Sequence, residues 1–258
     1  MDPTAAFFDS HAHLADERLH PQVEDVLRRA RAAGVNGVVA VGTRPDDWDL
    51  VVSLSEKHPD VFATVGIHPH AAGAASDEAF LTIRERVRHP GVVALGETGL
   101  DYHYDHAPRA EQRASFARHL EIAAETGLPV VVHARSADDD VRAMIGEAKG
   151  VMGVLHCFAG GRPLLEAALA AGWYISFSGL ITFRGYADAD LLRAVPDHRI
   201  LVETDAPYLA PTPLRGKTNA PEWVPLVAAR AAEIRGEDPA EFAARSVANT
   251  RVFYRLDS

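Results

Sequence analysis

The sequence has a single cysteine, Cys157, so no disulfide bond can form within the chain. No uninterrupted apolar run approaches the ~20 residues that a membrane-spanning helix needs. The first residues also lack the positive segment and the long apolar stretch of a secretory signal. These absences predict a cytoplasmic protein with no membrane partner.

Positive charge is scarce as well. The chain has 26 Lys and Arg residues against 36 Asp and Glu residues, which gives a formal net charge of -10. This balance argues against a broad basic face that binds a polyanion by counterion release. A nucleic-acid substrate would therefore have to be held by positive charge at a local site.

Two further absences concern organisation. No Gly-x-Gly-x-x-Gly turn follows a first strand, which argues against a dinucleotide-binding domain. No low-complexity linker, block of like charge or shift in composition divides the chain. We therefore expect one domain that spans residues 1–258.

Short apolar runs that end in polar residues recur along the chain. Each run is nearly continuously apolar and rich in Val or Ile, which is typical of parallel strands buried on both faces. The eight runs span residues 5–13, 35–43, 61–70, 91–101, 128–136, 152–158, 173–179 and 199–207.

Amphipathic segments with helix end signals separate these runs. In residues 20–34, Pro21 fits a first helical turn and Gly34 fits a C-terminal stop, and residues 109–127 and 136–150 follow a similar plan. Eight strands that alternate with helices over about 250 residues predict an α/β fold, a TIM-type (β/α)8 barrel. An open doubly wound sheet is the main alternative.

Histidines and carboxylates stand at the carboxyl ends of the predicted strands, where barrels of this type place functional residues. Because side chains alternate along a strand, Asp9, His11 and His13 share one side. We expect that side to face the barrel interior and Phe8 to face the helices. Four other runs end with further donors: Glu97, His133, His156 and Asp205.

Four imidazoles and two carboxylates are too many ligands for one tetrahedral ion, and they suit a pair of Zn²⁺, Mn²⁺ or Mg²⁺ ions. Each donor alone fits a capping or core role equally well, but their shared position at strand ends favours metal ligands. We expect Glu97 to bridge the two ions, and Asp205 to bind one ion and accept a proton from the attacking water. Glu203 has the same strand parity as Asp205 and either orients a ligand histidine or forms a buried salt bridge.

Motifs along nearly the whole chain resemble those of the TatD-type deoxyribonucleases, which are metal-dependent hydrolases of the amidohydrolase superfamily. The motifs are "DSHAHL", "GIHPH", "GETGLDY", "HCFAGG", "ISFSGLITF", "ETDAPYLAP" and "RGKTN". The resemblance implies a TIM-type barrel, two divalent metal ions and hydrolysis of phosphodiester bonds, commonly as a 3′-to-5′ exonuclease. It also implies the same metal ligands: His11, His13, Glu97, His133, His156 and Asp205.

The chain departs from this family pattern in two places. It reads "RGKTNAP" where the resemblance leads us to expect "RGKRNEP", and "HARSADDD" lacks the acid expected soon after its arginine. Neither departure touches a proposed metal ligand. Both bear on substrate preference at the rim of the site.

Several residues just beyond the strand ends are candidates for substrate contact. We expect His68 to touch a substrate phosphate and to take part in catalysis, whereas His70 fits a surface loop equally well. Asn219 fixes either its loop or the substrate. Cations that could hold phosphate oxygens, each of which alone also fits a solvated charge, are Arg135, Arg215 and Lys217.

The sequence offers two aromatic candidates for base stacking and one residue for packing. Tyr102 and Phe183 could stack on a base, or equally belong to a lid or the core. Cys157 is next to a proposed ligand, but strand alternation points it toward the helix layer. We therefore expect Cys157 to pack rather than to act as a nucleophile or ligand.

These observations predict a two-metal phosphodiesterase that acts, as a monomer, on single-stranded DNA ends or short oligonucleotides. A second interpretation directs the same chemistry at a carbonyl, as in cyclic amidohydrolases or D-aminoacyl-tRNA deacylases. Many amidohydrolases bridge their metals with a carboxylated lysine on the fourth strand, and this chain has no lysine at the end of that run. A third interpretation, a barrel that binds metal without catalysis, is disfavoured because structural metal sites are usually closed.

Overall fold

A computed structural model of the protein describes residues 6–256 and contains one sheet of eight parallel strands. Residue 5 of the first predicted run and both ends of the predicted 1–258 domain lie outside these residues. Neighbouring strands follow the order of the sequence from β1 to β8, as in a TIM-type barrel, and this confirms the predicted fold class. The strands are β1 (Phe7–Ala12), β2 (Val35–Val41), β3 (Val61–Val65), β4 (Val92–Asp101), β5 (Val130–Arg135), β6 (Gly153–Leu155), β7 (Tyr174–Phe177) and β8 (Ile200–Val202).

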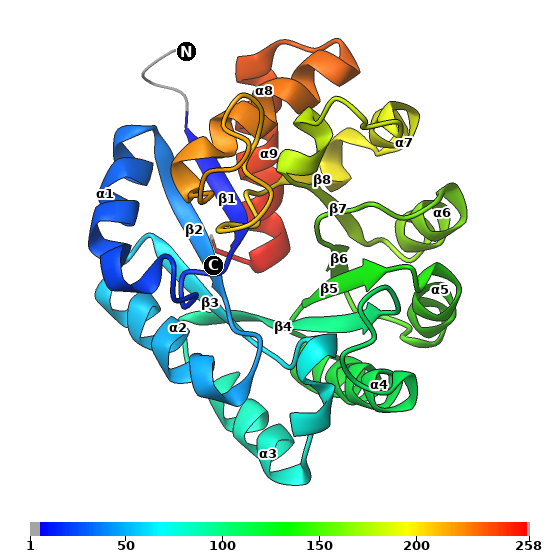
Figure 1. Ribbon diagram of the computed structural model, residues 1–258. Helices are drawn as coiled ribbons and strands as arrows, with labels where there is room; N and C mark the ends of the chain where they lie inside the picture. The colour runs from blue at the N-terminus through cyan, green and yellow to red at the C-terminus, as the bar shows by residue number, and fades with distance from the viewer. Residues whose placement is uncertain (1–5, 257–258) are drawn as a thin grey trace.

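Helices connect the strands and cover the outside of the ring (Figure 1). Short 3-10 turns, such as Pro69–Ala74 and Gly179–Thr182, lie in the loops after β3 and β7. Among residues 6–256, no helix is both long enough and apolar enough to cross a membrane. The helices are α1 (Val23–Ala32), α2 (Pro45–Lys57), α3 (Asp77–Arg86), α4 (Arg109–Thr126), α5 (Asp138–Glu147), α6 (Arg162–Ala170), α7 (Ala189–Ala194), α8 (Val224–Arg235) and α9 (Pro239–Tyr254).

The strands bury both of their faces. One face packs against the helices and contributes residues such as Val38, Val130 and Ile200 to the larger apolar cluster. The alternate residues form a second apolar cluster inside the ring, and Phe253 and Tyr254 from the end of α9 complete it. The ring is therefore filled with apolar side chains on the side of α9, and polar side chains are left for its opposite end.

β1 carries one more residue than β2 between Asp9 and Ala12, because Asp9 pairs with Val38 and Ala12 pairs with Ala40. Such a bulge changes which face the following side chains occupy. Phe8 packs inside the ring, so the expectation that it faces the helices is wrong. Because of the bulge, His11 faces the interior as well, although it is three residues further along the strand. Asp9 does not share a face with Phe8 and hydrogen-bonds to Thr204, behind the site rather than in it.

The barrel closes at the point where the predicted donors stand. The segment after β8 pairs with the end of β1 through an isolated bridge between Ala12 and Ala206. His13 donates its backbone N–H to Ala206 O at 2.7 Å, and Asp205 donates to His11 O at 3.0 Å. The hydrogen bonds that close the ring thus fix the backbone of three candidate ligands.

Candidate metal centre

A cavity of about 610 Å³ opens at the carboxyl ends of the strands. Five of the six predicted ligands line it, and the sixth, His11, is fully buried beneath its floor. The structure therefore gathers donors that are up to about 190 residues apart in the sequence. The five lining residues are His13, Glu97, His133, His156 and Asp205.

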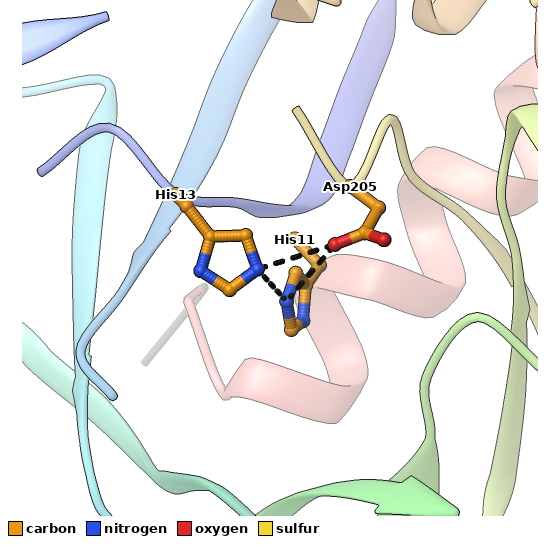
Figure 2. A group of neighbouring side chains, drawn as sticks. All are labelled: His11, His13 and Asp205. Atoms are coloured by element: carbon orange, nitrogen blue, oxygen red, sulfur yellow. Dashed lines mark hydrogen bonds and ion pairs between the residues drawn. The ribbon is translucent and has the colours of Figure 1, made fainter. Parts of the chain in front are cut away.

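The first group of donors consists of His11, His13 and Asp205. Figure 2 shows the His13 ring and the Asp205 carboxylate approaching the His11 ring from two sides. His13 Nε2 lies 3.3 Å from His11 Nε2 and 3.2 Å from Asp205 Oδ1. Two ring nitrogens and one carboxylate oxygen therefore face one small volume.

The second group consists of Glu97, His133 and His156. Glu97 Oε1 lies 2.8 Å from His156 Nε2 and 3.3 Å from His133 Nδ1. The two histidine nitrogens are themselves 3.3 Å apart. A second set of three donors thus converges within hydrogen-bonding distances.

Glu97 belongs to both groups through its two carboxylate oxygens. While Oε1 faces the second group, Oε2 lies 3.4 Å from His11 Nε2 and 3.6 Å from His13 Nε2. Burial opposes ionisation of this carboxyl, but His156, His68 and His11 outweigh it and hold the pKa of Glu97 well below its ordinary value. A carboxylate that stays ionised between two sets of histidines is suited to bridge two cations.

Two buried carboxylates orient the histidines of the second group. His156 Nδ1 donates to Glu203 Oε1 at 3.1 Å, and His133 Nε2 donates to Asp101 Oδ2 at 3.1 Å. Each contact directs one ring nitrogen at a carboxylate, and the other ring nitrogen faces Glu97, where it can offer its lone pair to a cation that displaces its proton. Carboxylates in this position fix the tautomer and orientation of metal-binding histidines.

Glu203 lies against His156 in a position that fits both of its predicted roles, the orientation of a ligand histidine and a buried salt bridge. It also accepts hydrogen bonds from Cys157 N at 2.8 Å and from Ser176 Oγ at 2.5 Å. Burial opposes protonation of His156, but Glu97 and Glu203 together raise its pKa well above the ordinary value. A proton held so firmly between carboxylates marks a position where a cation is favoured.

His68 lies against Glu97, with Nε2 at 3.3 Å from Oε1. Its other ring nitrogen, Nδ1, accepts a hydrogen bond from His70 N at 3.1 Å. Burial lowers the pKa of His68 to about 4, so the ring is neutral and its single proton resides on Nε2. His68 is therefore a hydrogen-bond donor into the cavity, whereas a ligand would need a free lone pair there.

The donor set fits divalent metal ions. Among the described residues, Glu97 Oε2 and His11 Nδ1 are buried without a hydrogen-bond partner. The His133 Nδ1 and His156 Nε2 atoms lie 3.3 Å apart, and the same distance separates the Nε2 atoms of His11 and His13. Imidazole nitrogens with carboxylate oxygens are ligands that Zn²⁺ and Mn²⁺ accept readily.

The structure brings some of the predicted substrate contacts to the cavity and leaves others outside. Arg135 is exposed and lines the cavity, together with Arg44, which no sequence pattern singled out. Arg215 and Lys217 are exposed but do not line it, and the Arg215 guanidinium lies 3.5 Å from the centre of the Phe183 ring. Asn219 is buried and donates to Thr204 O and Tyr208 O, so it fixes its loop.

The expected orientation of Cys157 is wrong. β6 ends at Leu155, and Cys157 has a positive φ of 44°, so strand alternation no longer applies to it. Its Sγ atom lies 3.0 Å from Ser178 Oγ, and the side chain lines the cavity. Burial raises the pKa of the thiol well above its ordinary value, which makes Cys157 a poor nucleophile.

Besides Arg44, three residues of the site were not selected from the sequence. Asp101 has the parity of Glu97 in the "GETGLD" run, and this signal alone could have selected it. Tyr104 and Tyr208 line the cavity, whereas the two predicted aromatic residues, Tyr102 and Phe183, do not. No strand pattern could have distinguished Tyr104 from Tyr102, because both follow the end of β4 in a loop.

Comparisons with known proteins agree with the sequence motifs. A family model described as TatD related DNase matches residues 8–255. YcfH of Escherichia coli (strain K12), named an uncharacterized metal-dependent hydrolase, is 40% identical over 256 residues, which cover 97% of this chain and 96% of YcfH. TatD of Erwinia tasmaniensis, named a 3'-5' ssDNA/RNA exonuclease, is 36% identical over 258 residues, which cover 96% of this chain and 100% of that protein. The crystal structure of YjjV, a TatD homologue from Escherichia coli K12, superposes with a TM-score of 0.91 at 29% identity and covers 96% of this chain and 98% of YjjV.

Proposed function

Because the chain belongs to the TatD related DNase family, we propose that this metal-dependent hydrolase cleaves phosphodiester bonds at the ends of single-stranded DNA, as a 3′-to-5′ exonuclease. Short oligonucleotides belong to the same substrate class. We further propose that it uses two divalent ions, one in each donor group. The relatives named as exonucleases support the proposed substrate. The geometry of the donors supports the proposed pair of ions.

The observation that carries the proposal is the position of Glu97 between the two groups. Its two oxygens face different histidines, at 2.8 Å from His156 and 3.4 Å from His11. Divalent ions there would polarise a phosphoryl oxygen and make water acidic enough to act as the nucleophile. A carbonyl-directed relative with a carboxylated lysine would need a lysine at this position, where the chain has glutamate.

The protein's own residues supply the remaining parts of the reaction. Asp205 is buried beside His13, and this histidine helps to hold the pKa of the carboxyl below its ordinary value against the effect of burial. Asp205 is therefore ionised and can accept the proton that the attacking water loses. His68 carries its proton on Nε2 and can donate it in a hydrogen bond to a phosphate oxygen, as the sequence predicts.

Positive charge near the cavity is local, as the acidic composition requires. Arg44 and Arg135 are exposed cations on its lining. Both can contact phosphate oxygens of a strand that enters the mouth. Such a site favours capture of one strand end over binding along the length of a duplex.

The test compares three substrates with the purified protein in Mn²⁺ or Mg²⁺: a single-stranded oligonucleotide, a cyclic amide and a D-aminoacyl-tRNA. We expect the oligonucleotide alone to be consumed and EDTA to stop the reaction. A label at the 5′ end yields a ladder that shortens one nucleotide at a time if cleavage starts at the 3′ end. Turnover of the amide or the ester without cleavage of DNA would overturn the proposal in favour of carbonyl chemistry, and no turnover of any substrate would favour a non-catalytic barrel.

A further inference from the structure

Two exposed tyrosines stand on the lining of the metal-centre cavity. The large apolar or aromatic side chains that are exposed among residues 6–256 are few, and of these only Tyr104 and Tyr208 line the cavity. Tyr104 is 54% exposed and Tyr208 is 45% exposed. Single exposed aromatic rings are ordinary on a protein surface, but two exposed rings that line the same cavity are available to a ligand that enters it. The full set of exposed side chains is Leu50, Leu81, Tyr104, Tyr208 and Val252.

The two tyrosines lie beside different donor groups. The Tyr208 ring contacts His13 edge to face, with the ring centres 5.6 Å apart, and His13 belongs to the first group. Tyr104 contacts His70 at 5.5 Å between ring centres, and both His70 and the second-group ligand His133 are hydrogen-bonded to Asp101. One exposed aromatic ring therefore lies beside each end of the donor array.

Each ring is held in place by its neighbours. Tyr104 N donates to Asp101 Oδ1 at 2.9 Å, and the ring lies parallel to His106 within 1°. The Tyr208 hydroxyl lies 3.3 Å from Asp16 Oδ2, and Asn219 fixes the Tyr208 carbonyl. Rings that are oriented before a ligand arrives lose little freedom when they bind it.

Both rings also have an arginine beside them. The Arg18 guanidinium lies 4.5 Å from the centre of the Tyr208 ring, and the Arg135 guanidinium lies 5.4 Å from the centre of the Tyr104 ring. An aromatic ring with an adjacent cation matches a nucleotide, which presents a flat base and a charged phosphate. This combination is typical of sites that bind single strands without reading their sequence.

We propose that Tyr104 and Tyr208 form a pair of base-stacking platforms that hold the unpaired nucleotides on the two sides of the phosphodiester bond at the metal centre. This inference rests on the proposed function, and it names what the site recognises: the faces of unpaired bases. Bases in a duplex are already stacked on their neighbours, so the pair favours single strands. Because every base has an aromatic face, the preference is for strand state rather than for sequence.

The experiment is a double-mutant cycle that combines tyrosine substitutions in the protein with missing bases in the substrate. The substrates are a single-stranded oligonucleotide and matched versions with a base-free residue at the terminal or the penultimate position. In the wild-type protein, each missing base raises KM by about 5-fold to about 100-fold, which is the contribution of one stacked base. Tyr104→Ala and Tyr208→Ala each raise KM for the intact oligonucleotide by a similar factor, and each becomes insensitive to one of the two missing bases.

Conservative and remote variants separate stacking from structure. Tyr104→Phe and Tyr208→Phe keep a flat ring and should retain a KM close to that of the wild type. Leu81→Ala removes an exposed side chain that does not line the cavity and should change nothing. If Tyr→Ala lowers kcat and leaves KM and the missing-base effects unchanged, the tyrosines do not stack on bases and the inference is overturned.

A second readout does not need turnover. An oligonucleotide with 2-aminopurine at its end is bound in EDTA, and stacking on tyrosine quenches its fluorescence. Quenching by the wild type that Tyr104→Ala or Tyr208→Ala loses supports the platforms even if no DNA is cleaved, in which case only the proposed function fails. Cleavage of DNA with no quenching and no missing-base effect overturns the platforms and leaves the proposed function in place.

Discussion

The two ends of this barrel are built from the same eight strands but bury opposite kinds of side chain. At the end covered by α9, Phe8 packs with Phe253 and Tyr254 in a cluster that is almost entirely apolar. At the other end, histidines and carboxylates such as His11 and Glu97 are buried equally deeply. Burial of the apolar end stabilises the folded protein. Burial of the polar end costs the solvation of its histidines and carboxylates, and hydrogen bonds or bound cations must compensate for that loss.

The residues that stabilise the fold and the residues of the candidate metal centre therefore lie at opposite ends of the barrel. The apolar end can stabilise the fold whatever the ligands do, because its cluster contains none of them. The polar end can keep buried donors whose desolvation destabilises the fold, because apolar packing in the rest of the barrel offsets that free-energy cost. Substitutions at the two ends should therefore have different signatures, and the following variants test that separation.

The largest effect is expected from Glu97→Gln. The amide removes the charge that both donor groups share, and Lewis-acid stabilisation is worth several kcal/mol, so kcat/KM should fall by about 1000-fold or more. Circular dichroism and cooperative thermal unfolding should remain, because both apolar clusters are untouched. DNA cleavage at the wild-type rate by this variant would show that Glu97 does not bridge the ions.

The mirror-image variant is Phe253→Ala at the apolar end. Phe253 is fully buried between Tyr174 and Tyr254, so the change should lower the free energy of unfolding by about 3–5 kcal/mol. The activity of the molecules that remain folded should stay close to that of the wild type. Val252→Ala is the matched control, since Val252 is 62% exposed on the same helix and its loss should cost less than about 0.5 kcal/mol. An unchanged unfolding free energy with lost activity would contradict the separation.

His119 provides a pH test outside the metal centre. Its Nε2 accepts from Ile67 N at 3.1 Å and its Nδ1 lies 2.7 Å from Ser115 O, so the buried ring must be neutral. Burial lowers its pKa to about 4 from 6.5. A lowered pKa gives stability that is fully present above pH 6.5 and is lost as the pH falls toward 4, by about 3 kcal/mol in total.

The measurement compares chemical unfolding of the wild type and His119→Gln in EDTA between pH 7 and pH 4. The variant lacks the titrating group, so the wild type's advantage should shrink by about 3 kcal/mol over this range. His198→Gln is the matched control, since it makes the same replacement at an exposed position. A wild-type advantage that does not depend on pH would mean that His119 is not held neutral by burial.

A smaller effect is expected from Asp101→Asn. Asp101 Oδ2 accepts from His133 and His70, and Oδ1 accepts from the N–H groups of His103 and Tyr104. An amide has one acceptor oxygen and one donor nitrogen, so it cannot satisfy both sides. Carboxylates that orient ligand histidines are worth 10- to 100-fold in metal affinity, and one of two binding events in a calorimetric titration should weaken by about that factor.

The control for this variant is Asp139→Asn, which removes an equal charge from an exposed position. It should leave both binding events unchanged. If Asp101→Asn also leaves both unchanged, the orientation of His133 does not depend on this carboxylate. If both events weaken equally, the two donor groups are not separate sites.

Much of the fold could be predicted because the apolar runs, and from them the number of strands, can be recognised in the sequence. Eight buried runs in alternation with helices specify a barrel, and the donors at their ends specify its functional face. The direction of individual side chains could not be predicted in β1, since an extra residue between Asp9 and Ala12 interrupts the alternation and lets both Phe8 and His11 face the interior. A bulge depends on pairing with the neighbouring strand, and the residues of β1 alone do not indicate that pairing.

The candidate site was predictable where it depends on strands and not where it depends on loops. The candidate ligands His133 and His156 stand at a strand end or directly after it and could be selected by position. Cys157 and Tyr104 follow strand ends, where the backbone turns freely, so their approach to the cavity is a tertiary effect. Arg215 also lies beyond a strand end, where its guanidinium contacts the Phe183 ring and does not line the cavity.

The most direct test of the central claim is anomalous diffraction from crystals of the protein grown with Mn²⁺. Two peaks about 3.5 to 4 Å apart are expected, both in contact with Glu97. One should be surrounded by His11, His13 and Asp205, and the other by His133 and His156. A single peak, or peaks that do not touch Glu97, would contradict the account.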